Sequence, residues 1–188
     1  MQLQPSSQKR LHGFFLDLTH KSFAQLGGGD GQIAEYVAEV LTEFSFSDRW
    51  ARMRDAEGKR ITSVVAMLVE QGNPDRDHLL DERQFRKYVG DYTLFMSGLF
   101  RRFVERGGCL RYYLDEGRRS YAKVSTLDAA LYRPGFAIFD ELSKGFEYYS
   151  GALDYMRKCF FSPGPNQDPF AGFFRQVENW MRDGLSRN

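Results

Sequence analysis

Apolar side chains recur at spacings of three and four along most of the chain, and apolar and polar residues almost never alternate. This spacing places apolar side chains on one face of an α-helix. The first expected helix covers residues 7–25, and a second covers residues 32–44. The glycine-rich stretch between them, residues 27–31, is expected to be a connector because consecutive glycines lose too much backbone entropy to stay helical.

The longest amphipathic pattern covers residues 77–106. Its apolar arc consists of Phe85, Tyr88, Val89, Tyr92, Phe95, Met96, Leu99, Phe100 and Phe103. The opposite side carries a stripe of small residues, Gly90, Thr93 and Ser97. Such a stripe admits a second backbone at close range or leaves room for a ligand, and we favour close packing. Shorter helices are expected at residues 48–54 and 61–71.

Three further segments complete the pattern. Residues 110–125 predict a helix interrupted at Gly117, followed by a turn at Tyr132-Arg133-Pro134-Gly135. Residues 139–160 then carry apolar positions at alternating spacings of three and four. This heptad seam is typical of nearly parallel helix packing. Its members are Phe139, Leu142, Phe146, Tyr149, Leu153, Met156 and Phe160.

The C-terminal segment, residues 163–188, is expected to be a Pro-Gly linker followed by a helix. This helix either packs back on the main bundle, residues 7–162, or extends to a partner. Its aromatic residues are therefore the candidate interaction surface: Phe170, Phe173, Phe174 and Trp180.

Together these patterns predict an all-α fold, a single compact bundle of about six to eight helices over residues 1–188. The composition agrees, with 42% hydrophobic and 15% aromatic residues, including 17 Phe. Large rings bury much apolar area per residue. A chain of this size needs no disulfide or metal for stability, and its two cysteines match no metal-binding spacing.

Charge narrows the possible partners. The net charge of +1 argues against binding to a polyanion over the whole surface. Residues 101–123 nevertheless hold seven basic and three acidic residues, with tyrosines between them. Arginine and tyrosine together suit phosphate groups, nucleobases or acidic protein surfaces. The candidate ligand or anion-binding residues are Arg101, Arg102, Arg118, Arg119, Tyr121 and Lys123, and the alternative is a solvated face whose arginines pair with acids.

A buried acid provides a second candidate site. Asp91 borders the aromatic arc of residues 77–106, next to Tyr88 and Phe95 on the helical wheel, and the candidate pocket consists of Asp91 with Tyr88 and Tyr92. Burial of an acid is costly unless it is paired. Asp91 is therefore expected either to accept core hydrogen bonds or to orient a ligand in a pocket with these two tyrosines.

Catalytic chemistry has little support in the sequence. The three histidines are scattered and make no zinc site. Cys109 follows two glycines at an expected helix start, where a thiolate is stabilised, but a nucleophile also needs a nearby base. We therefore expect no catalytic residue, no metal and no cofactor.

These patterns favour a non-enzymatic protein-interaction or regulatory module that binds a protein partner or itself. The alternatives are a small-ligand or cofactor-binding protein or enzyme with a pocket beside the long helix, and nucleic-acid or phosphate binding through residues 101–123. No apolar run approaches the roughly 20 residues of a membrane span. We expect a cytoplasmic protein without membrane association.

Overall fold

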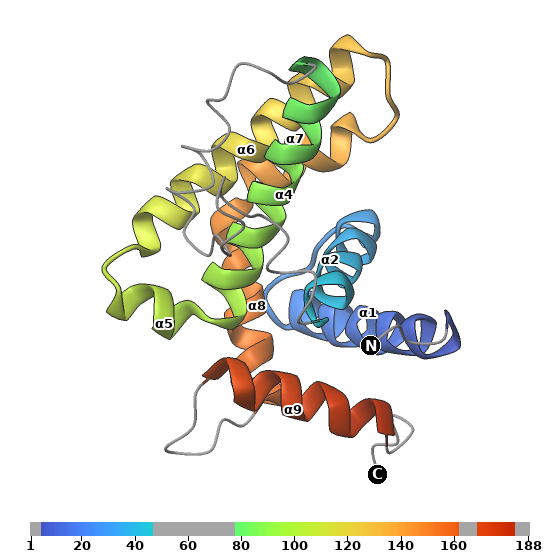
Figure 1. Cartoon of the computed structure of the whole chain (residues 1–188), viewed down its shortest axis with the longest axis vertical. Helices are drawn as coiled ribbons and strands as arrows, with labels where there is room; N and C mark the ends of the chain where they lie inside the picture. Colours follow the sequence, from blue (N-terminus) through green and yellow to red (C-terminus); the bar gives the residue numbers. More distant parts are fainter. Residues whose placement is uncertain (1–4, 47–77, 162–168, 183–188) are drawn as a thin grey trace, which may run out of the picture.

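The structure, a computed structural model, describes residues 5–46, 78–161 and 169–182 (Figure 1). Within these ranges it contains eight helices and no strand. The helices are α1 (Pro5–Gln25), α2 (Gly31–Phe44), α4 (His78–Leu99), α5 (Arg101–Arg106), α6 (Leu110–Ala130), α7 (Phe136–Lys144), α8 (Phe146–Phe160) and α9 (Pro169–Arg182). The predicted all-α fold is confirmed. The helices predicted at residues 48–54 and 61–71 and the linker before residue 169 lie outside the described residues.

Helix α4 is the centre of the bundle. It packs against α6 and α8, while α7 packs against α6 (Figure 1). Helices α1 and α2 pack against each other, and they contact α8 and α4, respectively. Every residue from Val89 to Phe100 is buried, since neighbouring helices cover several sides of this segment. The wide aromatic arc predicted from the sequence suits such a central position.

The small residues of α4 permit close helix packing. A Cβ atom at Gly90 would lie 2.6 Å from the Tyr121 ring of α6. Ser97 lies against α8, where Ser150 Oγ donates a hydrogen bond of 2.9 Å to Ser97 Oγ. The stripe of small residues therefore allows close helix packing, the alternative that we favoured from the sequence.

Gly117 does not interrupt its helix, as the sequence predicted it would. Helix α6 runs unbroken through this residue. The physical reason is space, because a Cβ atom there would lie 2.1 Å from Phe146 Cζ and 2.6 Å from Thr93 Oγ1. Glycine allows α6 to approach α4 and α8 closely while staying helical.

Two segments with one continuous periodicity each form two helices. The pattern of residues 77–106 is divided at Phe100, whose φ of −111° and ψ of 27° lie outside the helical region. The heptad seam is divided at Gly145, between α7 and α8. The seam is nevertheless covered by the same chain, because all its members except the half-buried Phe160 are buried.

Rings of α9 contact rings from the rest of the chain. Phe173 is 6% and Val177 1% exposed. The Phe173 ring lies 5.8 Å from that of Phe95, and the Trp180 ring lies 5.0 Å from that of Phe161. None of the described helices combines the length and apolarity needed to cross a membrane.

Candidate functional site

The turn between α6 and α7 differs from the rest of the described surface. Leu131 is 45%, Tyr132 97% and Phe136 47% exposed. Most other large apolar side chains of the described residues are buried or half-buried. Exposed apolar side chains are common singly, whereas here three lie within six residues of one turn. We call residues 131–136 the apolar turn.

The backbone of the apolar turn follows a known helix ending. Tyr132 N donates a hydrogen bond to Ala129 O at 3.2 Å, and Arg133 N donates one to Asp128 O at 2.8 Å. These two bonds make the Schellman motif, in which one residue takes the left-handed conformation. That residue is Tyr132, with φ of 50°.

The same chain shows the usual solution at another helix. At the end of α5, Gly108 N donates to Glu105 O and Cys109 N donates to Val104 O. The left-handed residue there is Gly108, with φ of 69°. Glycine is the common choice because a Cβ atom in this conformation costs about 1 kcal/mol. Tyr132 therefore adds conformational cost, and its solvated side chain recovers no burial energy within the chain.

Two contacts fix the apolar turn to the bundle. Arg83 of α4 donates to both carboxylate oxygens of the fully buried Asp128, from Nε at 2.5 Å and from Nη2 at 2.8 Å. Ser125 Oγ donates to Phe136 O at 3.0 Å, which joins the end of α6 to the start of α7. Bidentate pairing is strong and directional. The exposed side chains therefore project from a rigid base.

An open pocket lies at the other end of α6. Its volume is about 520 Å³, and its lining residues are Phe103, Val104, Arg106, Gly107, Cys109 and Tyr113. Phe103 is 47% exposed, while Val104 is buried. The free Cys109 thiol is exposed and donates to Gly107 O at 3.1 Å. We call this cavity the α5–α6 pocket.

Asp91 is the acceptor of a buried hydrogen-bond network. Its Oδ1 accepts from the hydroxyls of Tyr36 at 2.5 Å and Tyr121 at 2.8 Å, and its Oδ2 accepts from Lys87 Nζ at 2.7 Å. Burial raises the pKa of the carboxyl, and the ammonium group and both hydroxyls oppose this shift. The network joins α2, α4 and α6. This arrangement agrees with the structural alternative for Asp91, in which the carboxylate accepts core hydrogen bonds.

The two tyrosines predicted beside Asp91 have different surroundings. Tyr92 is 1% exposed and Tyr88 is half-buried. Their rings stack on each other at 6.2 Å, and both contact Phe44. Within the hydrogen bonds described for Asp91, Tyr36 and Tyr121 are its phenolic partners. A ligand site at Asp91, Tyr88 and Tyr92 stays a prediction.

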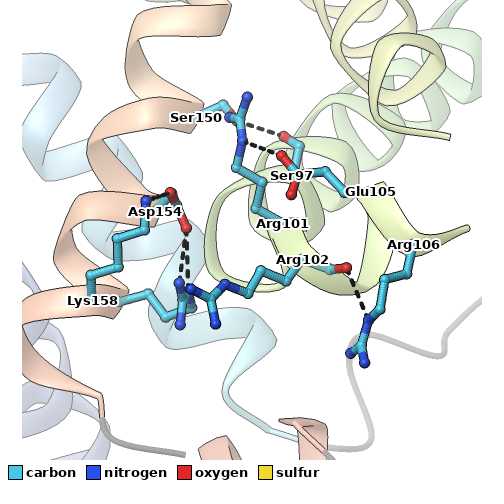
Figure 2. A network of polar contacts seen from close by, with 9 residues as sticks. Ser97, Arg101, Arg102, Glu105, Arg106, Ser150, Asp154 and Lys158 are labelled. Atoms are coloured by element: carbon cyan, nitrogen blue, oxygen red, sulfur yellow. Dashed lines mark hydrogen bonds and ion pairs between the residues drawn. The ribbon is translucent and has the colours of Figure 1, made fainter. Parts of the chain in front are cut away.

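The basic segment has its cations distributed over two helices and mostly paired. Arg101 pairs with Glu105 on α5 (Figure 2). On α6, Arg118 pairs with Asp115, Arg119 with Glu116, and Lys123 with Glu82 of α4. Arg102 is exposed. Tyr121 is fully buried in the Asp91 network, so its ring does not lie on the same surface as these cations.

Figure 2 also shows contacts within α5 and α8 and one contact between α4 and α8. Arg106 Nε donates to Arg102 O at 3.3 Å, and on α8 Lys158 lies 2.5 Å from Asp154. Ser97 and Ser150 meet where α4 contacts α8. Acidic side chains pair with the basic side chains in this region. This pairing favours the predicted solvated face over a site with unpaired arginines that binds an anion.

The aromatic residues of α9 face their own chain. Phe170 stacks on Phe100 at 4.3 Å, and Phe174 contacts Phe173 at 5.4 Å. Trp180 also contacts Phe14 of α1 at 4.7 Å. Phe170, Phe174 and Trp180 are half-buried. Their rings contribute to packing, and only their remaining exposed edges are open to a partner.

The apolar turn was not among the candidate sites predicted from the sequence. A turn was predicted at Tyr132-Arg133-Pro134-Gly135, but its side chains were given no role. The available signal was Leu131, Tyr132 and Phe136 within a turn, where polar residues are usual. Within the described residues, no group of three or more His, Cys, Asp or Glu side chains is arranged to hold a metal ion. Comparisons with known protein families, curated proteins and solved structures give no match to this chain.

Proposed function

We propose that the protein is a non-enzymatic interaction module that binds a protein partner through the apolar turn. The observation that carries this proposal is Tyr132, which is 97% exposed in a left-handed conformation. A large ring at this position costs stability and contributes no packing, so its use lies outside the folded chain. Strained backbone at a rigidly held surface site is typical of functional positions.

The composition of the apolar turn also supports a protein partner. Tyrosine is enriched at interface centres, where it supplies a large apolar area and one hydrogen-bonding group. Leu131 and Phe136 extend the apolar surface on either side of it. A partner that covers all three side chains removes their exposed apolar area from water.

The other two hypotheses have weaker support. A small-ligand site at Asp91 competes with three donors that already occupy its carboxylate. A nucleic-acid site on residues 101–123 competes with ion pairs at Arg101, Arg118, Arg119 and Lys123. We place the interaction in the cytoplasm, because the free cysteines Cys109 and Cys159 suit a reducing compartment.

Site-specific photocrosslinking tests the proposal. A photoreactive benzoylphenylalanine replaces Tyr132 in cells that naturally produce the protein, and a matched chain carries it at the exposed Ala24 of α1. We expect a discrete protein adduct at position 132 that is missing at position 24. Equal adducts at both positions, or none at 132, would contradict the proposal.

A further inference from the structure

We infer that the α5–α6 pocket binds a small aromatic anion, with the rings of Phe103 and Tyr113 against the apolar body of the ligand and Arg106 at its acidic group. An aromatic ring that carries a carboxylate, a sulfonate or a phosphate has this chemistry. The inference does not depend on the apolar turn, which follows the opposite end of α6. It adds a small-molecule site to the proposed interaction module.

The α5–α6 pocket has the size and walls of a small-molecule site. Its volume of about 520 Å³ lies within the range of roughly 300–1,000 Å³ that is typical of ligand pockets. Phe103 is 47% exposed and therefore retains apolar area that a ligand can cover. Its ring packs edge-on against Phe170 of α9 at 4.9 Å, and the Tyr113 ring lies 6.3 Å from that of Tyr92. Packing therefore supports both aromatic walls.

Backbone hydrogen bonds hold the segment between these two walls. Gly107 N donates to Phe103 O at 3.2 Å, and Cys109 N donates to Val104 O at 3.1 Å. The chain turns from α5 into α6 at Gly108, whose φ of 69° is left-handed. A pocket that is ordered in advance loses little conformational freedom when a ligand binds.

Two arginines of α5 differ from the paired bases of this segment. Arg101 pairs with Glu105, whereas Arg102 and Arg106 form no ion pair with an acid of the described residues. Arg106 lines the pocket and uses Nε to donate to Arg102 O at 3.3 Å, so that within the described residues both of its Nη groups remain without a partner (Figure 2). Residues 101–111 carry four arginines and one glutamate, a net charge of +3. This charge favours an anionic ligand over a neutral or cationic one.

The start of α6 favours the same sign of charge. This helix begins at Leu110, directly after the pocket residue Cys109, and no side chain caps it. Tyr113 N donates to Cys109 O at 3.0 Å, and the amides of residues 110–112 have no acceptor among the described residues. Such free amides and the helix dipole stabilise negative charge near a helix start. They act here beside the cavity that Arg106 lines.

Binding of anilinonaphthalene sulfonate, an aromatic sulfonate, to the native chain tests the inference. Cys109 and Cys159 are both exposed free thiols, and Cys109 lines the pocket whereas Cys159 does not. We expect a saturating amount of the sulfonate to slow the alkylation of Cys109 by iodoacetamide severalfold and to leave Cys159 unchanged, as measured by mass spectrometry of the peptides. An unprotected Cys109, or equal protection of both thiols, overturns the inference.

Variants separate the charge of the ligand from its shape. Arg106→Gln is expected to raise the Kd of the sulfonate about tenfold and to leave the Kd of the uncharged phenylnaphthylamine unchanged, both measured by ligand fluorescence. Arg111→Gln is the matched control, because Arg111 is 92% exposed, pairs with Asp115 and does not line the pocket. Equal effects of the two substitutions on the sulfonate would contradict a role for Arg106.

A variant that fills the pocket tests its shape. Cys109→Trp places a large ring in the cavity and is expected to weaken both ligands severalfold, with circular dichroism as the check on folding. Unchanged binding of the sulfonate to a folded Cys109→Trp chain would place the ligand elsewhere and overturn the inference.

Discussion

Tyr132 is the residue at which conformational cost and solvent exposure coincide. We predict that Tyr132→Gly raises the free energy of unfolding by about 1 kcal/mol, because glycine adopts a left-handed conformation without a Cβ penalty. Urea denaturation followed by circular dichroism measures the change. Tyr132→Ala is the control and brings little gain, since alanine keeps the Cβ atom. A loss of stability in Tyr132→Gly would show that the ring contributes to folding.

The buried tyrosines predict sensitivity to alkaline pH. Burial, together with the neighbouring Asp91, raises the pKa of Tyr36 and Tyr121 well above 10. In the unfolded chain these hydroxyls ionise near pH 10. Their contribution to stability is therefore complete below that pH and is lost as the pH rises toward their folded-state pKa values. Each such tyrosine adds a slope of about 1.4 kcal/mol per pH unit.

Tyr121→Phe tests this linkage. We expect the unfolding free energy, measured in urea from pH 8 to 11, to fall less steeply above pH 10 in this variant than in the native chain. Phe146→Leu is the matched control, since it weakens a buried contact without removing an ionisable group and keeps the native slope. An unchanged slope in Tyr121→Phe would mean that the hydroxyl ionises equally in both states.

Residue identity alone predicted part of the Asp91 network. Its position beside the aromatic arc indicated burial, and burial required partners. Lys87 is four residues earlier on the same helix, but the two phenolic partners, Tyr36 of α2 and Tyr121 of α6, are 55 and 30 residues away in sequence. Helical periodicity carries no information on contacts between helices, so these two donors could not be identified before the packing was known.

At the scale of the helix, Gly117 controls the approach of α6 to α4 and α8. We predict that Gly117→Ala lowers the unfolding free energy by about 1–3 kcal/mol, because its Cβ atom would overlap the Phe146 ring. Gly151→Ala on α8 is the matched control. No atom lies within 4 Å of a Cβ there, so the variant gains up to about 1 kcal/mol from helix propensity. Equal effects of the two substitutions would contradict close packing at Gly117.

Periodicity predicted most helices but failed at their internal breaks. The apolar spacing continues through Phe100 and Gly145, where the backbone leaves the helix. The spacing of apolar residues shows which face of a helix is apolar. It does not reveal where the helix changes direction, as long as the same face stays buried. Gly117 produced the opposite error, because a glycine that weakens an isolated helix also permits the closest helix contacts.

For the whole molecule, the sequence predicted the fold class and much of the core but not the candidate site. Burial follows from apolar spacing, which the chain displays clearly. The apolar turn depends instead on three side chains that stay exposed, as Leu26 and Phe103 also do, while most large apolar residues of the described chain are buried or half-buried. To find such a turn, the exposed fraction of each side chain must be known. That fraction depends on how the eight helices in the described part of the chain cover one another.

Hydroxyl-radical footprinting of the native chain tests binding through the apolar turn most directly, because it requires no amino-acid substitution. The oxidation rate of Tyr132 is measured in dilute purified protein and in the extract of cells that produce it, with Tyr155 of α8 as the internal reference. Binding through the apolar turn predicts a severalfold lower rate at Tyr132 in the extract and an unchanged rate at Tyr155. Equal oxidation of Tyr132 in both samples would contradict it.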